Sequence, residues 1–246
     1  MPAVLVHGVP ETDALWDGLV PLLGRDDVVT LQLPGFGCPR PDGFGATKEE
    51  YVDWLVAELE RRQADGPIDL LGHDWGGGFV VRLVSIRPDL VRSWATDGAG
   101  LGDIEFEWHD FAKIWQTPEE GERFWSEQLA TPIEERAGVF ELFGLSHDSA
   151  VKLSGMVDET MAGCILPLYR SAVDVGKEWG PDFRDIPKPG LVLAATEDAF
   201  LSLERSRVGA QLAGARFEVL EGLGHWWMLQ DPATAAAVIR DFWASC

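Results

Sequence analysis

The feature that most constrains the fold is a buried strand pattern that runs through a glycine-rich turn into a helix. Residues 68–71 (IDLL) are a short apolar run, and residues 72–77 (GHDWGG) place glycines on both sides of one aspartate. A helical pattern then covers about 75–87, and Pro88 helps to stop it. The glycines leave room for a strained turn that lifts the Asp74 side chain above a sheet.

Other strand and helix patterns alternate along the chain. Apolar, β-branched runs predict strands at 4–6, 28–31, 91–96, 190–195 and 217–220. A capping box at Thr47 and Glu50 predicts a helix over about 48–63, and Asp231-Pro232 predicts the start of the last helix. The alternation predicts an α/β fold, a mostly parallel sheet covered by helices on both faces, with ligand sites at the carboxyl ends of the strands.

Residues 102–186 differ in texture from the rest. They hold Trp108, Trp115, Trp125 and Trp179 among charged residues, and residues 119–129 and 150–166 have helical patterns. We expect a helical cap at 102–186, inserted after the fourth strand, and a core domain made of 1–101 and 187–246. Each tryptophan is as compatible with a small hydrophobic core as with a substrate-facing position.

Composition limits the class of protein. The chain has 246 residues, 46% of them hydrophobic, enough for one large domain without cross-links. The cysteines Cys38, Cys164 and Cys246 are odd in number and lack metal-ligand spacing, which favours reduced thiols in the cytoplasm. No long uncharged apolar stretch and no basic leader is present, so neither a membrane span nor export is expected.

The charge is strongly acidic. With 41 acidic and 20 basic residues the net charge is −21, which would repel phosphate backbones and small anions at long range. Nucleic acid is therefore not an expected partner. A solvated acidic surface explains the excess better than a functional acidic patch.

Three residues form a candidate catalytic set. Asp74 lies in the turn, Asp198 follows the predicted strand 190–195, and His225 follows the strand 217–220. Alone, Asp74 could cap the next helix, and Asp97, after the strand 91–96, is an alternative acid. Asp198 has the better strand-then-loop pattern, and together the three predict a nucleophile, an acid and a histidine in the order Asp74, Asp198, His225.

Four motifs together give a family resemblance. His7-Gly8-Val9-Pro10, residues 72–77, Thr196-Glu197-Asp198 and Gly224-His225-Trp226 resemble the aspartate-nucleophile branch of the α/β hydrolases, which contains epoxide hydrolases and haloalkane dehalogenases. The resemblance implies an oxyanion hole made by the backbone N–H groups of Val9 and Trp75, with His7 structural and His73 part of the turn. Because the chain starts at the strand before His7, the family's upstream hairpin is missing and a sheet of about six strands is expected.

The resemblance also implies a reaction. A carboxylate of this branch displaces a leaving group from saturated carbon and becomes an ester. His225, oriented by Asp198, then activates water against the Asp74 ester. No cofactor and no metal is expected.

The leaving-group donors should come from the cap. Residues 169–172 (YRSA), followed by Trp179, resemble the epoxide hydrolase segment whose tyrosine binds the epoxide oxygen, although Tyr169 could merely pack inside the cap. The other tyrosine, Tyr51, lies on a predicted core helix. In place of a second cap tyrosine we expect His109, which could instead be an exposed residue, with Phe111 there in another register. His147 is interpreted as a surface residue. We therefore expect hydrolysis of a small neutral, mostly apolar epoxide by water to a diol.

Other functions stay open. A haloalkane dehalogenase could use Trp75 with Trp108 or Trp115, but Val9 stands where those enzymes typically have Asn or Glu. Fluoroacetate dehalogenases resemble the Trp108-His109 and Tyr169-Arg170 segments, yet they carry arginines where this chain has Trp75 and Gly78. A non-catalytic binding protein on the same fold is the alternative from a different class. The oligomeric state is open.

Overall fold

The computed structural model describes residues 2–246, and its centre is a sheet of six parallel strands in the order β2-β1-β3-β4-β5-β6. Its strands are β1 Ala3–Val6, β2 Val28–Leu31, β3 Ile68–Gly72, β4 Val91–Thr96, β5 Gly190–Ala195 and β6 Arg216–Leu220. The fold class and the number of strands predicted from the sequence are confirmed.

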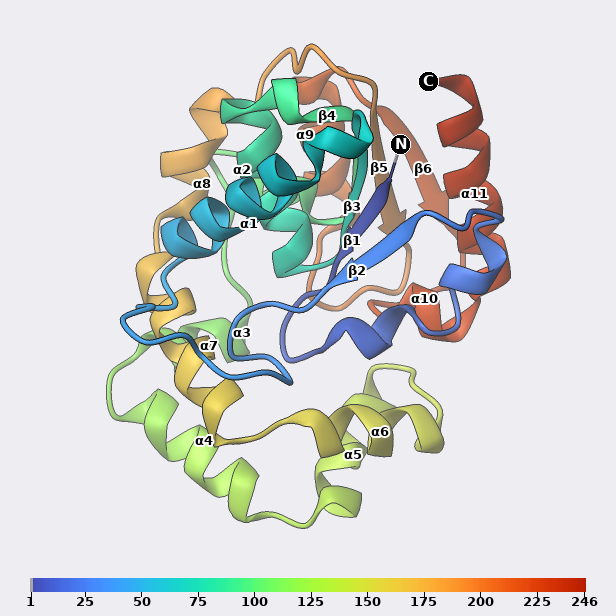
Figure 1. The fold of residues 1–246 in the computed structure, drawn as a ribbon. Helices are drawn as coiled ribbons and strands as arrows, with labels where there is room; N and C mark the ends of the chain where they lie inside the picture. The colour runs from blue at the N-terminus through green and yellow to red at the C-terminus, as the bar shows by residue number, and fades with distance from the viewer. Residues whose placement is uncertain (1) are drawn as a thin grey trace.

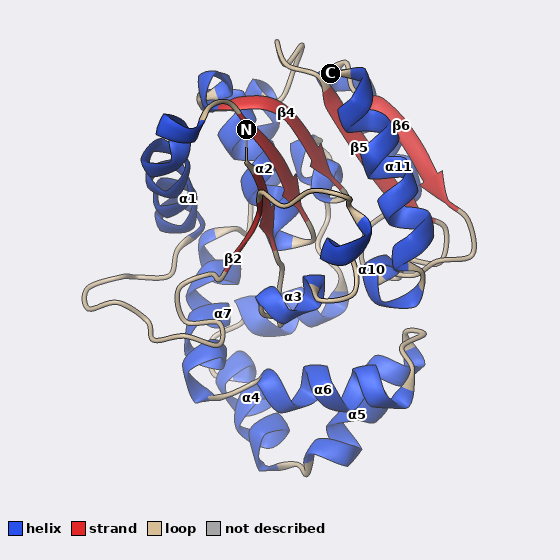
Figure 2. Ribbon diagram, turned by 45° about the vertical axis from the view of Figure 1, so that its right-hand side comes forward, coloured by secondary structure: helices blue, strands red, loops and turns tan. Residues whose placement is uncertain are grey.

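Helices cover both faces of the sheet (Figures 1 and 2). Residues of α1 (Lys48–Arg62), α2 (Trp75–Ile86) and α9 (Leu203–Ala213) pack in the core on one face, while α11 (Pro232–Ser245) packs in the core on the other. The short α10 (Trp227–Gln230) precedes α11. Short 3₁₀ helices complete these connections: η1 Asp13–Trp16, η2 Val20–Leu22, η3 Gln63–Asp65, η4 Pro88–Leu90, η5 Gly98–Gly102 and η6 Gly180–Asp182.

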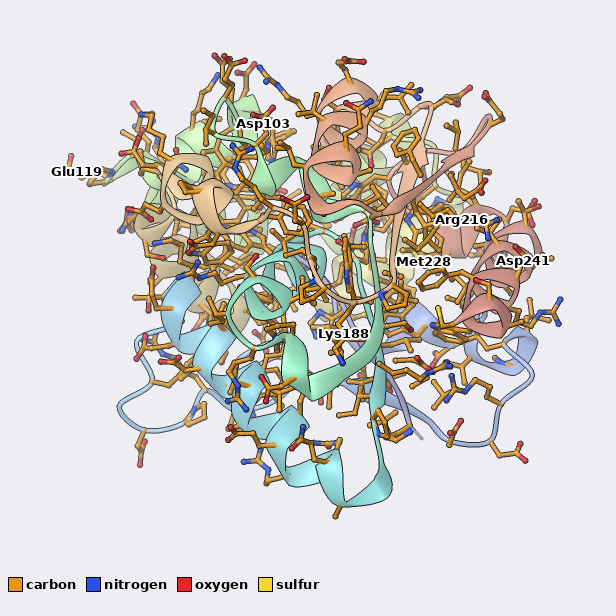
Figure 3. All side chains as sticks on the ribbon, turned by 90° about the horizontal axis from the view of Figure 1, so that it is seen from above. Asp103, Glu119, Lys188, Arg216, Met228 and Asp241 are labelled. Carbon is orange, nitrogen blue, oxygen red and sulfur yellow. The ribbon has the colours of Figure 1, made fainter. Side chains whose placement is uncertain are left out.

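Strand β1 explains why the sheet is buried on both sides. Val4 and Val6 belong to the core beneath α1 and α2, and Ala3 and Leu5 belong to the core beneath α11. Successive side chains of a strand point to opposite faces, so a continuous apolar run suits a strand covered twice. At the edge strand β6, Arg216 pairs with Asp241 of α11 at 2.7 Å, and Figure 3 shows the two side chains near each other.

The segment between β4 and β5 is helical and lies across the carboxyl ends of the strands (Figures 1 and 2). Its helices are α3 Asp110–Gln116, α4 Glu120–Ala130, α5 Ile133–Leu142, α6 His147–Met156, α7 Glu159–Ser171 and α8 Val175–Trp179. The last part of the segment, α8 and η6, contacts the core elements η5 and α2. We keep the term cap for residues 102–186.

The helical pattern over 150–166 corresponds to two helices. The chain leaves helical geometry at Val157 and starts again at Glu159. The cause is local: the Asp158 carboxylate accepts the Met161 N–H at 2.8 Å and caps a new helix. Apolar periodicity continues through the break and so does not reveal it.

Two further findings bear on the sequence expectations. No helix among the described residues is long and apolar enough to cross a membrane. Cys38, Cys164 and Cys246 are free thiols.

Candidate active site

Asp74 lies in a strained turn between β3 and α2. Its backbone has φ 51° and ψ −120°, a region that residues other than glycine rarely adopt. The turn needs close backbone approaches, because a Cβ at Gly76 would lie 2.3 Å from the Val6 carbonyl oxygen. The Asp74 carboxylate makes no capping bond to α2, so it is not held as a helix cap.

Asp97, the alternative acid, fixes this turn instead of reaching His225. Its Oδ1 accepts the Asp74 backbone N–H at 2.8 Å, and its Oδ2 accepts the Trp227 indole N–H at 2.8 Å. The same Oδ2 lies 2.5 Å from Nδ1 of His73. Both carboxylate oxygens are therefore committed to holding the turn.

Asp198 and His225 come together at the ends of β5 and β6. Nδ1 of His225 lies 2.9 Å from Oδ2 of Asp198, and the other Asp198 oxygen accepts the backbone N–H groups of Phe200 and Leu201. Burial opposes the charge of Asp198, but the His225 charge and these hydrogen bonds lower its pKa. An ionised Asp198 accepts a hydrogen bond from the Nδ1–H group, so His225 in its neutral form presents a free Nε2 lone pair.

That Nε2 faces the nucleophile candidate, since it lies 3.9 Å from Oδ2 of Asp74. The separation exceeds a direct hydrogen bond. Burial lowers the pKa of His225, but the Asp198 charge outweighs this effect, and the net pKa is raised. The sequence candidates Asp74, Asp198 and His225 thus lie at one site.

Backbone N–H groups stabilise the charged Asp74 carboxylate. Val9 donates its N–H to Oδ1 at 2.8 Å, and the Trp75 N–H lowers the pKa of the carboxylate. A Cβ at Gly8 would lie 2.4 Å from the Asp74 Cβ, so only glycine permits this approach. Burial raises the pKa of Asp74 to about 6, although the His225 charge and the Trp75 N–H oppose the rise.

Sequence reasoning missed a buried carboxylate beside the turn. Glu11 is fully buried and accepts hydrogen bonds from the Gly8 N–H at 2.8 Å and the Trp226 indole at 2.6 Å. It also lies 3.1 Å from Nε2 of His73. Burial alone would raise the Glu11 pKa, but His73 lowers it to about 2. No local sequence signal marks Glu11, since its side-chain partners His73 and Trp226 are distant in sequence.

His73 and His7 have structural positions in this network. Burial lowers the His73 pKa, but Asp97 and Glu11 outweigh it and hold the pKa well above its usual range. A charged His73 therefore bridges two carboxylates. His7 accepts the Leu33 N–H on Nε2 at 3.1 Å, and its Nδ1 lies 2.9 Å from the Gly8 carbonyl oxygen, which occupies both ring nitrogens.

One acid–histidine group has metal-ligand spacing. Ligand atoms of Glu11, His73 and His225 lie within 4.8 Å of one another, the single such group among residues 2–246. Both nitrogens of His73 face carboxylates, and both oxygens of Glu11 accept hydrogen bonds from other donors. This donor set fits a charged histidine between two acids better than a metal.

A cavity of about 740 Å³, counting its opening to solvent, lies between the strand ends and the cap. Asp74, His225 and Val9 line it from the core, and Tyr169 and His109 line it from the cap. Aromatic side chains dominate the remaining wall. Phe111, the alternative to His109, lines it as well, so both registers place a side chain at the cavity.

Tyr169 and His109 both have donor character. Tyr169 is 2% exposed, and burial, reinforced by the nearby Asp74 charge, raises its pKa well above the usual range. Nδ1 of His109 accepts the Ala112 N–H at 3.2 Å, so the neutral ring carries its proton on Nε2. Burial, followed by the His225 charge, lowers the His109 pKa to about 4 and keeps this ring neutral.

The cap tryptophans differ in what their indole groups do. The Trp108 indole donates to the Ala172 carbonyl at 2.8 Å and stacks on Trp75. The Trp115 and Trp125 indole N–H groups are buried without a partner, and both residues line the cavity. Trp75 also has a buried, unpartnered indole N–H, but it does not line the cavity. His147 is exposed and bonds Glu141.

Comparisons with known proteins place the chain among hydrolases. The family model described as "Alpha/beta hydrolase family" matches residues 3–238. An (E)-2-((N-methylformamido)methylene)succinate hydrolase of Acinetobacter baylyi is 25% identical over 80% of this chain and 72% of the relative. A haloalkane dehalogenase of Psychrobacter cryohalolentis is 33% identical over 47% of this chain, an alignment that spans 39% of that relative.

A structural comparison agrees with these matches. The crystal structure of Epoxide Hydrolase A from Mycobacterium thermoresistibile superposes with a TM-score of 0.74 and 20% identity over 98% of this chain and 90% of that chain. At this identity the likeness establishes the fold.

Proposed function

We propose that this chain, which belongs to the α/β hydrolase family, opens a mostly apolar epoxide to a diol through an ester on Asp74. The observation that carries the proposal is the cavity, which Asp74 lines from the core and Tyr169 and His109 line from the cap. An opening epoxide needs a carboxylate at carbon and a proton donor at oxygen. The surroundings suit an uncharged, apolar reacting end.

The first step breaks one C–O bond of the epoxide. Oδ1 of Asp74 is held by the Val9 N–H, so Oδ2 is the free oxygen that attacks carbon and forms the ester. The developing alkoxide is a stronger base than a phenolate, so it takes the Tyr169 proton even though the pKa of that group is raised. Because His109 is neutral, it supports the alkoxide as a hydrogen-bond donor.

The second step returns the carboxylate. Water beside Oδ2 gives a proton to Nε2 of His225, which Asp198 orients, and attacks the carbonyl carbon of the Asp74 ester. Charge develops on Oδ1, where the Val9 N–H already binds, and the Trp75 N–H is the proposed second donor. The ester C–O bond breaks, one proton of the water goes to the departing alkoxide, and the other restores the Tyr169 hydroxyl. The neutral diol leaves, and Asp74, again a carboxylate, keeps the oxygen of the water.

Dehalogenation is the second candidate function. It is favoured by the unpartnered indole N–H groups of Trp115 and Trp125 at the cavity, which are donors of the kind a departing halide needs. Against it, Val9 offers no polar side chain, and the Trp108 indole already donates to Ala172. Its first and second steps would otherwise use the same Asp74 ester.

A paired panel of epoxides and haloalkanes, assayed for diol and for halide, tests the proposal. We expect diol from the epoxides, no activity in Asp74→Ala, and full activity in His147→Gln, a control at an exposed histidine. Halide release without diol would favour dehalogenation. Activity that survives in Asp74→Ala would exclude the aspartyl ester, and binding without turnover of any substrate would favour a non-catalytic role.

A further inference from the structure

One guanidinium lines the cavity from a helix that carries none of the candidate catalytic residues. Arg136 of α5 is the cationic side chain of the wall besides the histidines, and Gln128 of α4 and Ser154 of α6 are its uncharged polar neighbours in the wall. The other walls near them are aromatic or aliphatic. The proposed epoxide chemistry uses none of these three residues.

Arg136 is poorly satisfied. Its Nη1 donates to the Val157 carbonyl at 3.4 Å, a long contact, and its buried Nε has no partner. Within residues 2–246 no carboxylate forms an ion pair with it, whereas Arg170 on α7 pairs with Glu122 at 2.7 Å. A half-buried guanidinium facing apolar side chains without a counter-charge is unfavourable unless a ligand supplies the charge.

Ser154 gives an independent sign of a missing ligand. Its side chain is 1% exposed, and its hydroxyl oxygen is buried without a partner. The Arg136 contact goes to Val157, three residues after Ser154 at the end of α6, so the two side chains lie on adjoining helices. Buried polar groups in native proteins normally find a partner.

Arg136 and Ser154 come from other elements than Asp74, which indicates how a substrate would be oriented in the cavity. Arg136 and Ser154 belong to α5 and α6 of the cap, whereas Asp74 lies at the end of β3, and all three line the same cavity. Aromatic residues line it as well, among them Phe140 and Trp125. A ligand that reaches both walls needs a reactive end, an apolar body and a polar far end.

We propose that the cavity binds substrates that end in a carboxylate, which Arg136 and Ser154 hold while the epoxide lies at Asp74. The planar guanidinium matches a carboxylate, and the serine hydroxyl can donate to the same group. The sequence predicts an uncharged substrate from the net charge of −21, but that field acts at long range, whereas Arg136 acts at contact. The identity of the reactive end, an epoxide, rests on the proposed function. The carboxylate subsite does not depend on it.

Binding of saturated chains tests the carboxylate subsite without any epoxide chemistry. Titration calorimetry should give octanoate a Kd about tenfold lower than octanol in the wild type, the advantage expected of one charge-assisted contact. Arg136→Gln should remove that advantage, Ser154→Ala should reduce it, and Arg136→Lys should keep part of it. Arg123→Gln removes the same charge from an exposed site on α4 and should leave both affinities unchanged.

Turnover then separates the two proposals. Octanoate bearing a terminal epoxide should have a lower KM than its methyl ester, and Arg136→Gln should equalise the two KM values with little change in kcat. Equal octanoate and octanol affinities in the wild type, or equal losses for both in Arg136→Gln, would overturn the carboxylate subsite. Selective octanoate binding without epoxide turnover would uphold it and overturn the epoxide proposal.

Discussion

The strand ends and the cap differ in how far their buried polar groups are hydrogen-bonded. At the strand ends, Asp97, Glu11 and Asp198 each bind two or more donors, so the carboxylates around Asp74 are fixed before any ligand arrives. In the cap, Ser154, Arg136 and Trp115 have buried polar atoms without partners. The contrast concerns the carboxylates, since the Trp75 indole N–H at the strand ends is also unpartnered. Under the proposed function the fixed carboxylates are preorganised for the reaction, and the unpartnered cap groups that line the cavity gain partners from the substrate.

Replacing the histidine at the strand ends should have the largest effect. His225→Gln keeps the size of the side chain but removes the base, so the reaction should stop at the ester with a fall in kcat of about 10³-fold or more. Intact-protein mass spectrometry should detect the accumulated adduct. A variant that turns over steadily without an adduct would show that the core does not use His225 as base.

Removing the proposed proton donor of the cap should lower the rate less than replacing His225. Tyr169→Phe keeps the packing against Trp115 and deletes the hydroxyl, and should lower the ring-opening rate by about 10²-fold. His109→Phe should cost less than this, because a neutral ring is a supporting donor. Single-turnover kinetics with an epoxide measures both. A larger loss in His109→Phe than in Tyr169→Phe would reverse the assigned roles.

The network beneath the turn should contribute stability. Glu11→Ala leaves His73 charged with one acid fewer in a buried site, a change that costs about 3–5 kcal/mol of unfolding free energy. Chemical denaturation at neutral pH measures it. The folded pKa of Glu11 is about 2, against 4.5 for the ordinary group, so its contribution is present above pH 4.5 and lost as the pH falls toward 2. A wild-type advantage that persists at pH 2 would contradict this origin.

Per pH unit, the pH dependence should be the smallest of these changes. Asp74 attacks as a carboxylate and has a pKa of about 6, so kcat/KM should fall about tenfold per unit as the pH drops below about 6. Because the pKa of Tyr169 lies well above its usual range, Tyr169 should cause no fall in kcat/KM at mildly basic pH. A kcat/KM that is flat from pH 7 to 4 would mean that another group attacks.

The same contrast explains what the sequence could predict. The core strands, the Thr47 capping box and the grouping of Asp74, Asp198 and His225 follow from local patterns, because parallel strands end at one edge of a sheet. Glu11 was missed because its side-chain partners, His73 and Trp226, are distant in sequence. Arg136 follows Glu134 and Glu135, and nothing in that charged run distinguishes a cavity residue from a solvated one. The break at Val157 could not be predicted, because apolar periodicity continues across it.

The central claim is that Asp74 becomes an ester of the substrate, and a single turnover in H₂¹⁸O tests it most directly. With enzyme in excess over the epoxide, the oxygen added to the diol should be ¹⁶O from Asp74, and the tryptic peptide that contains Asp74 should gain one ¹⁸O. A first-turnover diol that carries ¹⁸O, with an unlabelled Asp74 peptide, would mean that water attacks the substrate directly and would contradict the claim.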